Sequence, residues 1–281
     1  MLRFFGPLIA PIVGLGFILA LAWGFITTPH EAAVESATHV YHREPKEIAY
    51  SFDGPAGKYD RQQLQRGFQV YKEVCSACHS MKLVAFRDLE EIGFTKPEVK
   101  AIAKQWAVEV PSINPDTGEA ATRKAIPSDY FPSPYANETA ARAANNNALP
   151  PDLSLIAKAR EGGAHYTYSL LTCYAEQPAD LLKKFPDAKT PVGLHYNPYF
   201  ANLNIAMPPP LVAEGQVSYG AGQPKPTVDR MARDASAFLM WAAEPKLENR
   251  HRTGFAVLIY LLIGTGLAYG DYRNVWRGKK H

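Results

Sequence analysis

The chain has few cysteines and no clear strands, and both shortages narrow its class. Only Cys75, Cys78 and Cys173 occur among its 281 residues, too few for a disulfide framework. A paired zinc site would need a second Cys-x-x-Cys or a His-x-His cluster, and the sequence contains neither. Convincing alternation of polar and apolar residues is also lacking. We therefore predict a mainly α fold with long irregular loops, which the 23 prolines favour.

Positive charge is scarce outside the two ends of the chain. The ends hold five basic residues and one acidic one: Arg3, Asp271, Arg273, Arg277, Lys279 and Lys280. They carry +4, whereas the formal net charge of the whole chain is +3, so the body between them carries −1. A body of this charge makes nucleic acid an implausible partner. The basic ends suit the cytoplasmic face of a membrane instead.

Residues 75–79, Cys-Ser-Ala-Cys-His, form the most informative motif. Cys-x-x-Cys-His is typical of a c-type haem attachment site. The thiols of Cys75 and Cys78 can form thioether bonds to the haem vinyl groups, and the His79 imidazole then lies next to the iron. A dithiol redox motif is the alternative, but it would sit in a βαβ pattern. The sequence predicts one covalent haem c, attached outside the cytoplasm.

An uncharged leader predicts export. The apolar run from Phe4 to Thr28 exceeds the core of about 7–15 residues in a signal peptide and is long enough to cross a bilayer. Its small-x-small pattern, Ala20-Leu21-Ala22, lies inside the run. We expect residues 1–30 to be a signal peptide or, preferably, a retained signal anchor. A mitochondrial transit peptide is disfavoured because the segment is not Arg-rich and amphipathic.

A second apolar segment runs from Thr253 to Gly270. As a helix it would span about 27 Å, just enough for a bilayer. The basic residues that follow place the tail in the cytoplasm by the positive-inside rule, which leaves the haem on the other side. We therefore expect an exported cytochrome c domain at residues 31–246, and a transmembrane helix with a short basic tail at residues 247–281.

Helical periodicity predicts several short helices in the exported part. Asp60 is expected to cap a helix in which Leu64, Phe68 and Tyr71 form an apolar stripe under the haem. Four further helices are expected around Lys96–Trp106, Leu153–Arg160, Thr167–Tyr174 and Thr227–Ala243. The remainder of residues 95–150, and residues 177–227, are expected to be irregular.

The second axial position of the iron decides the chemistry. An open position suits a peroxidase or gas binding, whereas His/Met ligation raises the potential and suits electron transfer. Among the five methionines, Met207 lies directly before Pro208–Pro210, and such a stiff loop can hold a weak thioether ligand. A core methionine before a proline turn is the alternative. The sequence favours Met207 as the ligand.

Six stretches occur in one order over about residues 60–270. They are residues 66–71 leading into the haem motif, Ser128–Pro132, Ala140–Ser154, Asn197–Phe200, Met207–Pro210 and Trp241–Pro245. In these stretches the chain resembles the cytochrome c1 family, the haem-bearing subunit of ubiquinol–cytochrome c oxidoreductase (the cytochrome bc1 complex), in its bacterial form. Together the stretches are far more specific than Cys-x-x-Cys-His alone.

The resemblance implies a set of haem contacts. They are attachment at Cys75 and Cys78, axial ligands His79 and Met207, propionate partners Arg160 and Tyr166, and lining residues Asn145 and Pro151. An arginine can bind a carboxylate bidentately and offset its charge. Judged without the family, Arg160 would be a solvated charge at a helix end.

Two departures from the family stand out. Some bacterial members have an extra disulfide before the Met ligand, whereas Cys173 has no partner here. Packing and proline stiffness alone are therefore expected to hold the Met207 loop. Cys173 itself is expected to be a buried small hydrophobe. The leader, if uncleaved, adds a second membrane helix where the family typically has one.

The function implied by the resemblance is a one-electron relay in the bacterial inner membrane, with the haem domain on the periplasmic side. A Rieske iron–sulfur protein would deliver the electron and a cytochrome c would accept it, within a dimeric complex that contains cytochrome b. No catalytic residue is predicted, because the chain makes and breaks no substrate bond. The alternatives are a membrane-anchored carrier that works alone and a haem peroxidase, which usually needs a second haem.

One acidic cluster is a candidate for partner recognition. Asp88, Glu90 and Glu91 could steer a basic cytochrome c towards the haem. Such a cluster is more often only a solvated surface.

Overall fold

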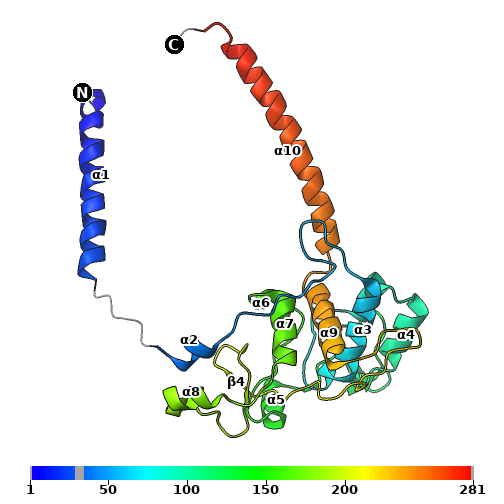
Figure 1. The fold of residues 1–281 in the computed structure, drawn as a ribbon. Coiled ribbons are helices and arrows are strands. Elements are labelled where there is room, and N and C mark those ends of the chain that lie inside the picture. The colour runs from blue at the N-terminus through cyan, green and yellow to red at the C-terminus, as the bar shows by residue number, and fades with distance from the viewer. Residues whose placement is uncertain (1, 29–34, 280–281) are drawn as a thin grey trace. The chain divides into compact units, whose positions relative to one another are not determined.

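Helices make up about half of the chain, and strands are few. The computed structural model describes residues 2–28 and 35–279 (Figure 1). The chain divides into two compact units, residues 1–40 and 41–281, and each is described by itself. The predicted mainly α fold is confirmed. The expected boundaries at residues 30 and 246 stay predictions.

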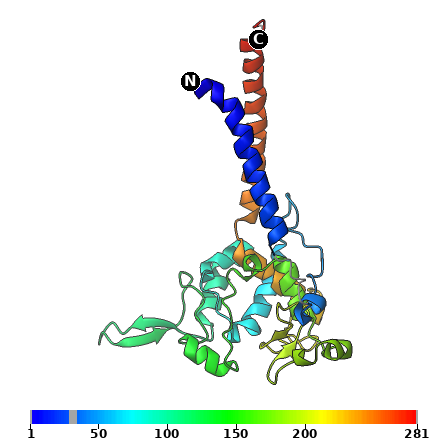
Figure 2. The ribbon, with the colours of Figure 1, turned by 90° about the vertical axis from the view of Figure 1, so that its left-hand side faces the viewer.

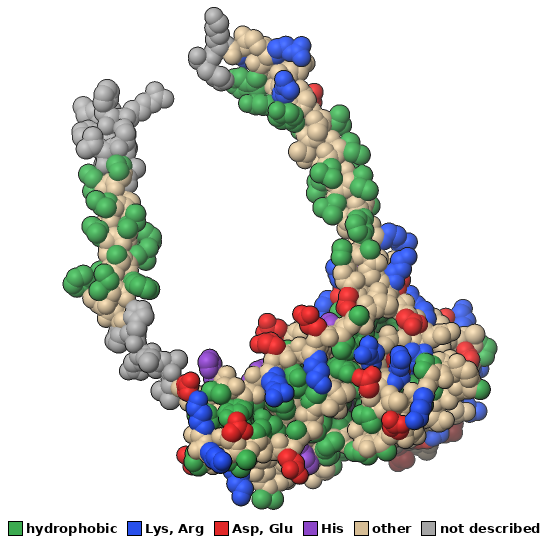
Figure 3. Space-filling view, viewed as in Figure 1, with side chains coloured by type: hydrophobic (Ala, Val, Ile, Leu, Met, Phe, Trp, Pro, Cys, Tyr) green, Lys and Arg blue, Asp and Glu red, His purple; other side chains and the backbone are tan. Residues whose placement is uncertain are grey.

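The first unit consists chiefly of helix α1, Leu2–Thr27. Residues 11–27 of this helix are apolar, and Figure 3 shows hydrophobic side chains along the coloured part of the helix. The predicted apolar leader is therefore helical. Residues 29–34 lie outside the described residues, and the choice between a cleaved signal peptide and an anchor stays a prediction. Helix α2, Ala37–Tyr41, lies at the boundary between the two units.

Two helices that are distant in sequence pack together in the second unit: α3, Arg61–Glu73, and α9, Val228–Ala243. A carboxylate caps the first of them, as predicted. Asp60 Oδ1 accepts from the backbone N–H groups of Gln62 and Gln63 at 2.9 and 3.3 Å. Capping satisfies donors that have no partner within the helix, so α3 begins at a defined residue.

The apolar stripe of α3 is buried, as predicted. Leu64, Phe68 and Tyr71 are each at most 3% exposed and belong to the main core cluster. Cys75 packs against the same cluster. Aromatic rings dominate this core, and those within 7 Å of Phe68 or Tyr71 are Phe94, Trp106, Phe131 and Phe238. The haem motif therefore follows directly on a helix whose apolar face is buried in the main core.

A glycine and a buried ion pair set the closeness of α3 and α9. A Cβ at Gly67 would lie 2.0 Å from the Asp234 carbonyl oxygen, so only glycine fits there. Beside it, Arg66 Nε and Nη2 donate to the two Asp234 carboxylate oxygens at 2.8 and 3.3 Å. Gln63 Nε2 also donates to Asp234, at 3.1 Å. Asp234 is completely buried, so these bonds compensate for its lost hydration.

The second unit also contains shorter helices. They are η2 Phe86–Ile92, α4 Lys96–Lys104, α5 Glu138–Ala144, α6 Ile156–Ala159, α7 Gly163–Thr172, α8 Ala179–Lys184 and η3 Pro186–Ala188. Of these, η2, α6 and α7 contact the pair of α3 and α9. The helix expected near residue 96 and the one that becomes α9 are confirmed. Helices α5 and α8 occur where irregular chain was expected. The predicted start of α7 at residue 167 is wrong, because Gly162 adopts a left-handed φ of 79° as its N-cap and the helix begins at Gly163.

Two small antiparallel hairpins were not predicted. Strand β1, Val110–Ile113, pairs with β2, Ala120–Arg123, and β3, His195–Tyr196, pairs with β4, Asn204–Ile205. Figure 2 shows the β1–β2 hairpin projecting from the helical body. These strands are too short to produce a visible alternation in the sequence.

Helix α10, Leu247–Trp276, is long and apolar enough to cross a membrane. It begins six residues before the predicted segment and ends six residues after it. Figure 3 shows hydrophobic side chains along its length and Lys or Arg side chains near both ends. The predicted C-terminal membrane helix fits this element.

Candidate haem site

The haem motif forms a tight turn at the end of α3. Helix α3 ends at Glu73, and the 3₁₀ turn η1, Cys75–Ala77, follows. The N–H groups of Cys78 and His79 both donate to the Cys75 carbonyl, at 3.1 and 2.9 Å. Both thiols are free, and burial raises the pKa of the Cys75 thiol to about 12. The turn therefore presents two free thiols and an imidazole from one short segment.

One hydrogen bond orients the His79 ring. Its Nδ1 lies 2.8 Å from the Pro151 carbonyl oxygen, so Nδ1 carries the proton and Nε2 keeps its lone pair. Burial lowers the pKa of His79 and outweighs the Pro151 bond and the Asp152 charge, which raise it. A neutral, oriented imidazole of this kind is a suitable metal ligand. Pro151, predicted as a haem-lining residue, thus contacts the predicted iron ligand through its carbonyl.

The residues after Pro151 hold the chain that follows His79. Asp152 Oδ2 accepts from the Ser80 hydroxyl at 2.8 Å and from the Lys82 N–H at 2.9 Å. Ser154 Oγ accepts from the Leu83 N–H at 3.0 Å. Our sequence interpretation gave Asp152 and Ser154 no role. An Asp-x-Ser pair after two prolines is a local turn-forming pattern, which could have suggested these bonds.

Asn145 connects to the haem motif through a tyrosine. It ends helix α5, and its Nδ2 donates to the Ala141 carbonyl at 2.7 Å and to the Tyr135 hydroxyl at 3.0 Å. The Tyr135 hydroxyl in turn lies near the Cys78 side chain. The structure therefore brings a predicted lining residue close to one of the two cysteines.

Arg160 and Tyr166 lie together on the two sides of the α6–α7 turn. Burial raises the pKa of Tyr166, although the nearby positive charge of Arg160 opposes the rise. Arg160 also donates to the Ala159 carbonyl at 3.1 Å, and its side chain is exposed. A phenol and a guanidinium side by side can together donate to a carboxylate. Their contact with a haem propionate stays a prediction.

Met207 follows strand β4 and is half-buried. A buried asparagine fixes the turn before it: Asn197 Nδ2 donates to the Leu170 carbonyl of α7 at 2.8 Å, and its N–H donates to the Leu203 carbonyl at 2.8 Å. A cavity of about 570 Å³ lies beside this loop, and its walls include Tyr174, His195, Tyr196 and Pro209. The role of Met207 as a ligand stays a prediction.

The expectation that packing and proline stiffness alone hold the Met207 loop is wrong. Gln216 bridges it, because its Nε2 donates to the Pro210 carbonyl at 2.8 Å and its Oε1 accepts from the Val212 N–H at 2.9 Å. Leu211 between these contacts is buried. An amide side chain therefore adds two hydrogen bonds to the chain that follows Met207.

One other expectation also needs correction. Cys173 is half-buried rather than buried, lies 3.4 Å from Thr172 Oγ1 and lies near Lys46. Asp88, proposed for steering, has a structural use, since its Oδ2 accepts from the Ala85 N–H at 2.8 Å and caps η2. Glu90 and Glu91 are exposed, and a role of the whole cluster in steering stays a prediction.

The chemistry of this donor set fits a haem. Two free thiols suit thioether bonds, and an imidazole with a free Nε2 suits the iron. The residues that would hold the group come from three separate regions: η1 with His79, the loop at Pro151, and the loop at Met207. Cys75 packs against the apolar core, and an apolar shell helps to set the potential of a haem.

The fold and this site define a class, that of membrane-anchored cytochromes with a small helical haem domain. The Cytochrome C1 family model matches residues 50–279. The chain is 44% identical over 246 residues to cytochrome c1 of Rhodospirillum rubrum, covering 83% of this chain and 87% of that one. It is 43% identical over 252 residues to a mitochondrial cytochrome c1 heme protein of Arabidopsis thaliana, covering 90% of this chain and 78% of that one.

A longer relative matches equally well. The cytochrome b/c1 protein of Bradyrhizobium diazoefficiens is 44% identical over 249 residues, which is 83% of this chain but only 36% of that protein. The chain therefore spans about a third of this relative's length.

The chain belongs to the Cytochrome C1 family. Members of this family are haem-binding electron carriers of the bc1 complex. The predicted family is confirmed, and helix α10 fits the membrane anchor of such a protein.

Proposed function

We propose that this chain relays single electrons from a Rieske iron–sulfur protein to a cytochrome c, through one covalent haem c. It does so as a subunit of a dimeric quinol–cytochrome c oxidoreductase that contains cytochrome b. The haem domain lies on the periplasmic side of a bacterial inner membrane. The observation that carries this proposal is the free thiol pair in one turn with an oriented, neutral His79.

The chain's own residues would bind and tune the cofactor. Cys75 and Cys78 would attach it covalently, and His79 Nε2 and the Met207 thioether would occupy the two axial positions. Haem iron bound in this way supplies reversible one-electron transfer at a high potential. Arg160 and Tyr166 would hold the propionates, while Asn145 and Pro151 would line the pocket. Because both axial positions would be filled by the protein, no substrate would reach the iron.

Two observations support a relay over a peroxidase. The sequence contains one Cys-x-x-Cys-His motif, whereas such a peroxidase usually needs a second haem. The loop that carries Met207 is secured on both sides, by Asn197 and by Gln216. A secured thioether can remain on the iron through both redox states. Carbon monoxide should therefore bind little to the reduced protein.

Electrophoresis of intact complexes tests the proposal. We expect a haem-stained band that co-migrates with cytochrome b and with the iron–sulfur protein. In membranes that lack the iron–sulfur protein, quinol should no longer reduce this haem, whereas ascorbate should still reduce it. A haem-stained band only near the chain's own 31.0 kDa would support the stand-alone carrier instead. Unchanged quinol-driven reduction without the iron–sulfur protein would refute the relay.

A further inference from the structure

The first turn of the membrane helix belongs to the haem domain. Helix α9 ends at Ala243 and α10 begins at Leu247, so only residues 244–246 separate them. Leu247 is 3% exposed and is part of the main core cluster. The direction in which α10 leaves the domain is therefore set by contacts within the domain.

A carboxylate on this first turn is held by the start of α3. Glu248 Oε1 accepts from the Tyr59 N–H at 2.9 Å and from Arg61 Nη1 at 2.9 Å, and its Oε2 accepts from Arg61 Nη2 at 3.2 Å. The guanidinium contact is bidentate, which fixes an orientation as well as a distance. Arg61 is the first residue of α3, the helix that ends at the haem motif.

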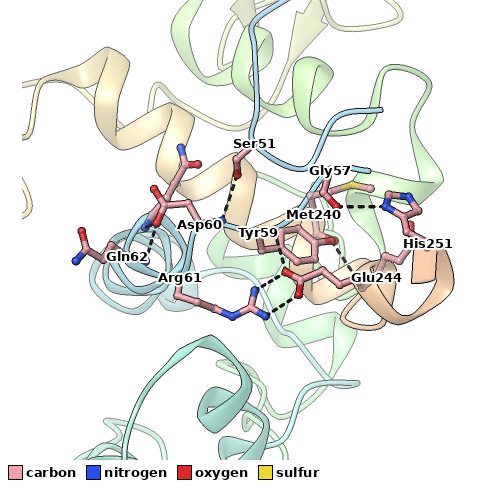
Figure 4. Close-up of polar contacts among 11 residues, drawn as sticks. Ser51, Gly57, Tyr59, Asp60, Arg61, Gln62, Met240, Glu244 and His251 are labelled. Carbon is pink, nitrogen blue, oxygen red and sulfur yellow. Dashed lines mark hydrogen bonds and ion pairs between the residues drawn. The ribbon is translucent and has the colours of Figure 1, made fainter. Parts of the chain in front are cut away.

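Two aromatic side chains complete the junction, as Figure 4 shows. The Tyr59 hydroxyl donates to the carbonyls of Glu244 and Met240, at 3.0 and 3.3 Å, where α9 ends. His251 Nδ1 lies 3.2 Å from the Gly57 carbonyl oxygen. A Cβ at Gly57 would lie 2.2 Å from Phe52 backbone atoms, so this loop is closed tightly.

A second carboxylate holds α10 from the other side. Glu244 forms an ion pair with Arg250 of α10, and its Oε2 lies 3.3 Å from Lys158 Nζ of α6. Glu244 is only 11% exposed at its side chain. The beginning of α10 is thus tied to α3, to the end of α9 and to α6.

We infer that Tyr59, Arg61, Glu244, Glu248 and His251 form a clamp that makes α10 and α3 one rigid body. Helix α3 is about 20 Å long, with the clamp at one end and Cys75 just beyond the other. Arg61 and Glu248 are therefore positioning residues that set the height of the haem-attachment segment above the membrane. The bearing of this on electron transfer rests on the proposed function, since electron transfer slows steeply with distance.

Distances between spin labels test the clamp directly. Labels are placed at Lys100→Cys on α4 and Ala256→Cys on α10, both exposed positions, in the full-length holoprotein in lipid nanodiscs. A Cys173→Ser background removes the remaining free thiol. The parent should show one narrow distance distribution. Arg61→Gln and Glu248→Gln should each broaden and shift it, and the charge-swapped Arg61→Glu/Glu248→Arg pair should restore it.

A matched ion pair serves as the control. Arg123 and Asp129 form the same bidentate contact, and the arginine is similarly exposed, at 40% against 43% for Arg61. Arg123→Gln should therefore leave the label distances unchanged. Distributions for Arg61→Gln and Glu248→Gln that match the parent would overturn the inference. If one variant yields no holoprotein, the other variant and the charge-swapped pair decide.

A second readout separates this inference from the proposed function. In the intact complex, Arg61→Gln should slow quinol-driven cytochrome c reduction while leaving the haem spectrum and midpoint potential unchanged. A parent chain without a c-type haem spectrum would refute the proposed function and leave the label distances valid. A shifted midpoint potential in Arg61→Gln would mean that Arg61 acts on the haem pocket, and would refute its role in positioning.

Discussion

The orientation of the His79 ring depends on a carboxylate that makes no direct contact with it. Pro151 accepts the Nδ1 proton, and Asp152 fixes this loop by accepting from the Ser80 hydroxyl, the Lys82 N–H and the Ser154 N–H, at 2.8 to 2.9 Å. Three hydrogen bonds to the Asp152 carboxylate restrict the movement of the Pro151 carbonyl, which directly precedes it in the chain. Outer contacts of this kind usually matter almost as much as the ligands themselves.

Asp152→Asn should weaken the haem site in a pH-dependent way. Burial raises the pKa of Asp152, but the bonds from Ser154, Lys82 and Ser80 outweigh it, and the net pKa lies below its usual 3.8. The contribution of the Asp152 carboxylate to stability is thus fully present above pH 3.8. It is lost as the pH falls through the lower pKa that this carboxylate has in the folded state. At neutral pH the NH₂ group of the substituted side chain would face one of these hydrogen-bond donors. This would lower the stability by about 2 kcal/mol.

Urea unfolding followed by haem absorbance measures this effect. The unfolding midpoint of Asp152→Asn should lie below that of the parent at neutral pH, and the difference should shrink below pH 3.8. Asp116→Asn, an exposed carboxylate in the β1–β2 turn, should match the parent throughout. A constant difference at all pH values would contradict the expectation.

Met207→Leu should lower the midpoint potential without unfolding the domain. Leucine has nearly the same volume, so packing is retained, but the thioether is lost. Axial ligands tune haem potentials over about 0.8 V, and we expect a fall on the order of 100 mV. Redox titration of the holoprotein measures it. Met231→Leu, in the core of α9, is the control and should leave the potential unchanged. A parent-like potential in Met207→Leu would remove Met207 from the iron.

Helices α3 and α9 can pack this closely because Gly67 has no Cβ atom. The backbone of α9 approaches Gly67 so closely that a Cβ would lie 2.0 Å from the Asp234 carbonyl oxygen and 2.7 Å from Phe238 Cβ. Neither of these atoms is the end of a flexible side chain. Any larger residue must push the helices apart and disturb the aromatic core below the haem motif.

Gly67→Ala should therefore destabilise the domain, although alanine is the better helix former. Overpacking of this kind costs about 1–3 kcal/mol, which exceeds the gain in helix propensity of up to about 1 kcal/mol. Chemical unfolding of the holoprotein measures the balance. Gly220→Ala is the matched control, because no described atom lies within 4 Å of its added Cβ. Equal stability of Gly67→Ala and the parent would refute the close approach.

The molecule as a whole is a haem domain whose last helix is also its anchor. Helix α10 starts in the domain core at Leu247, and Arg273 and Arg277 lie at its far end. Positive charge after a membrane helix favours a cytoplasmic tail. The haem motif lies in the domain that precedes this helix. The orientation of α10 in the membrane therefore determines the side on which the haem motif lies and the side on which the tail lies.

Reporter fusions test this topology. Green fluorescent protein fused after His281 should fluoresce, and alkaline phosphatase fused there should be inactive, because the tail is expected in the cytoplasm. Phosphatase fused after Lys246, before α10, should be active. Active phosphatase after His281 would indicate the reverse orientation of α10. That orientation would place the haem motif on the side of the membrane where haem is not attached.

Contiguous features of the chain were predictable without its structure. The haem motif, the Asp60 cap, the stripe on α3 and the apolar segment of α10 each depend on residues a few positions apart. The two hairpins were missed because their strands are too short for alternation to be visible. The apolar segment predicted at Thr253–Gly270 did not include the polar first turns of α10, because these turns lack a hydrophobic run.

Local chemistry therefore decided which groups this chain presents, namely two thiols, an imidazole, a thioether before three prolines and an apolar helix. Folding decided where they point. The Pro151 carbonyl at His79, the Asn197 bond to Leu170 before the Met207 loop, and the Glu248 contact with Arg61 join segments that are 72, 27 and 187 residues apart in sequence. Contacts of this kind depend on how helices pack, and no periodicity along the chain encodes them.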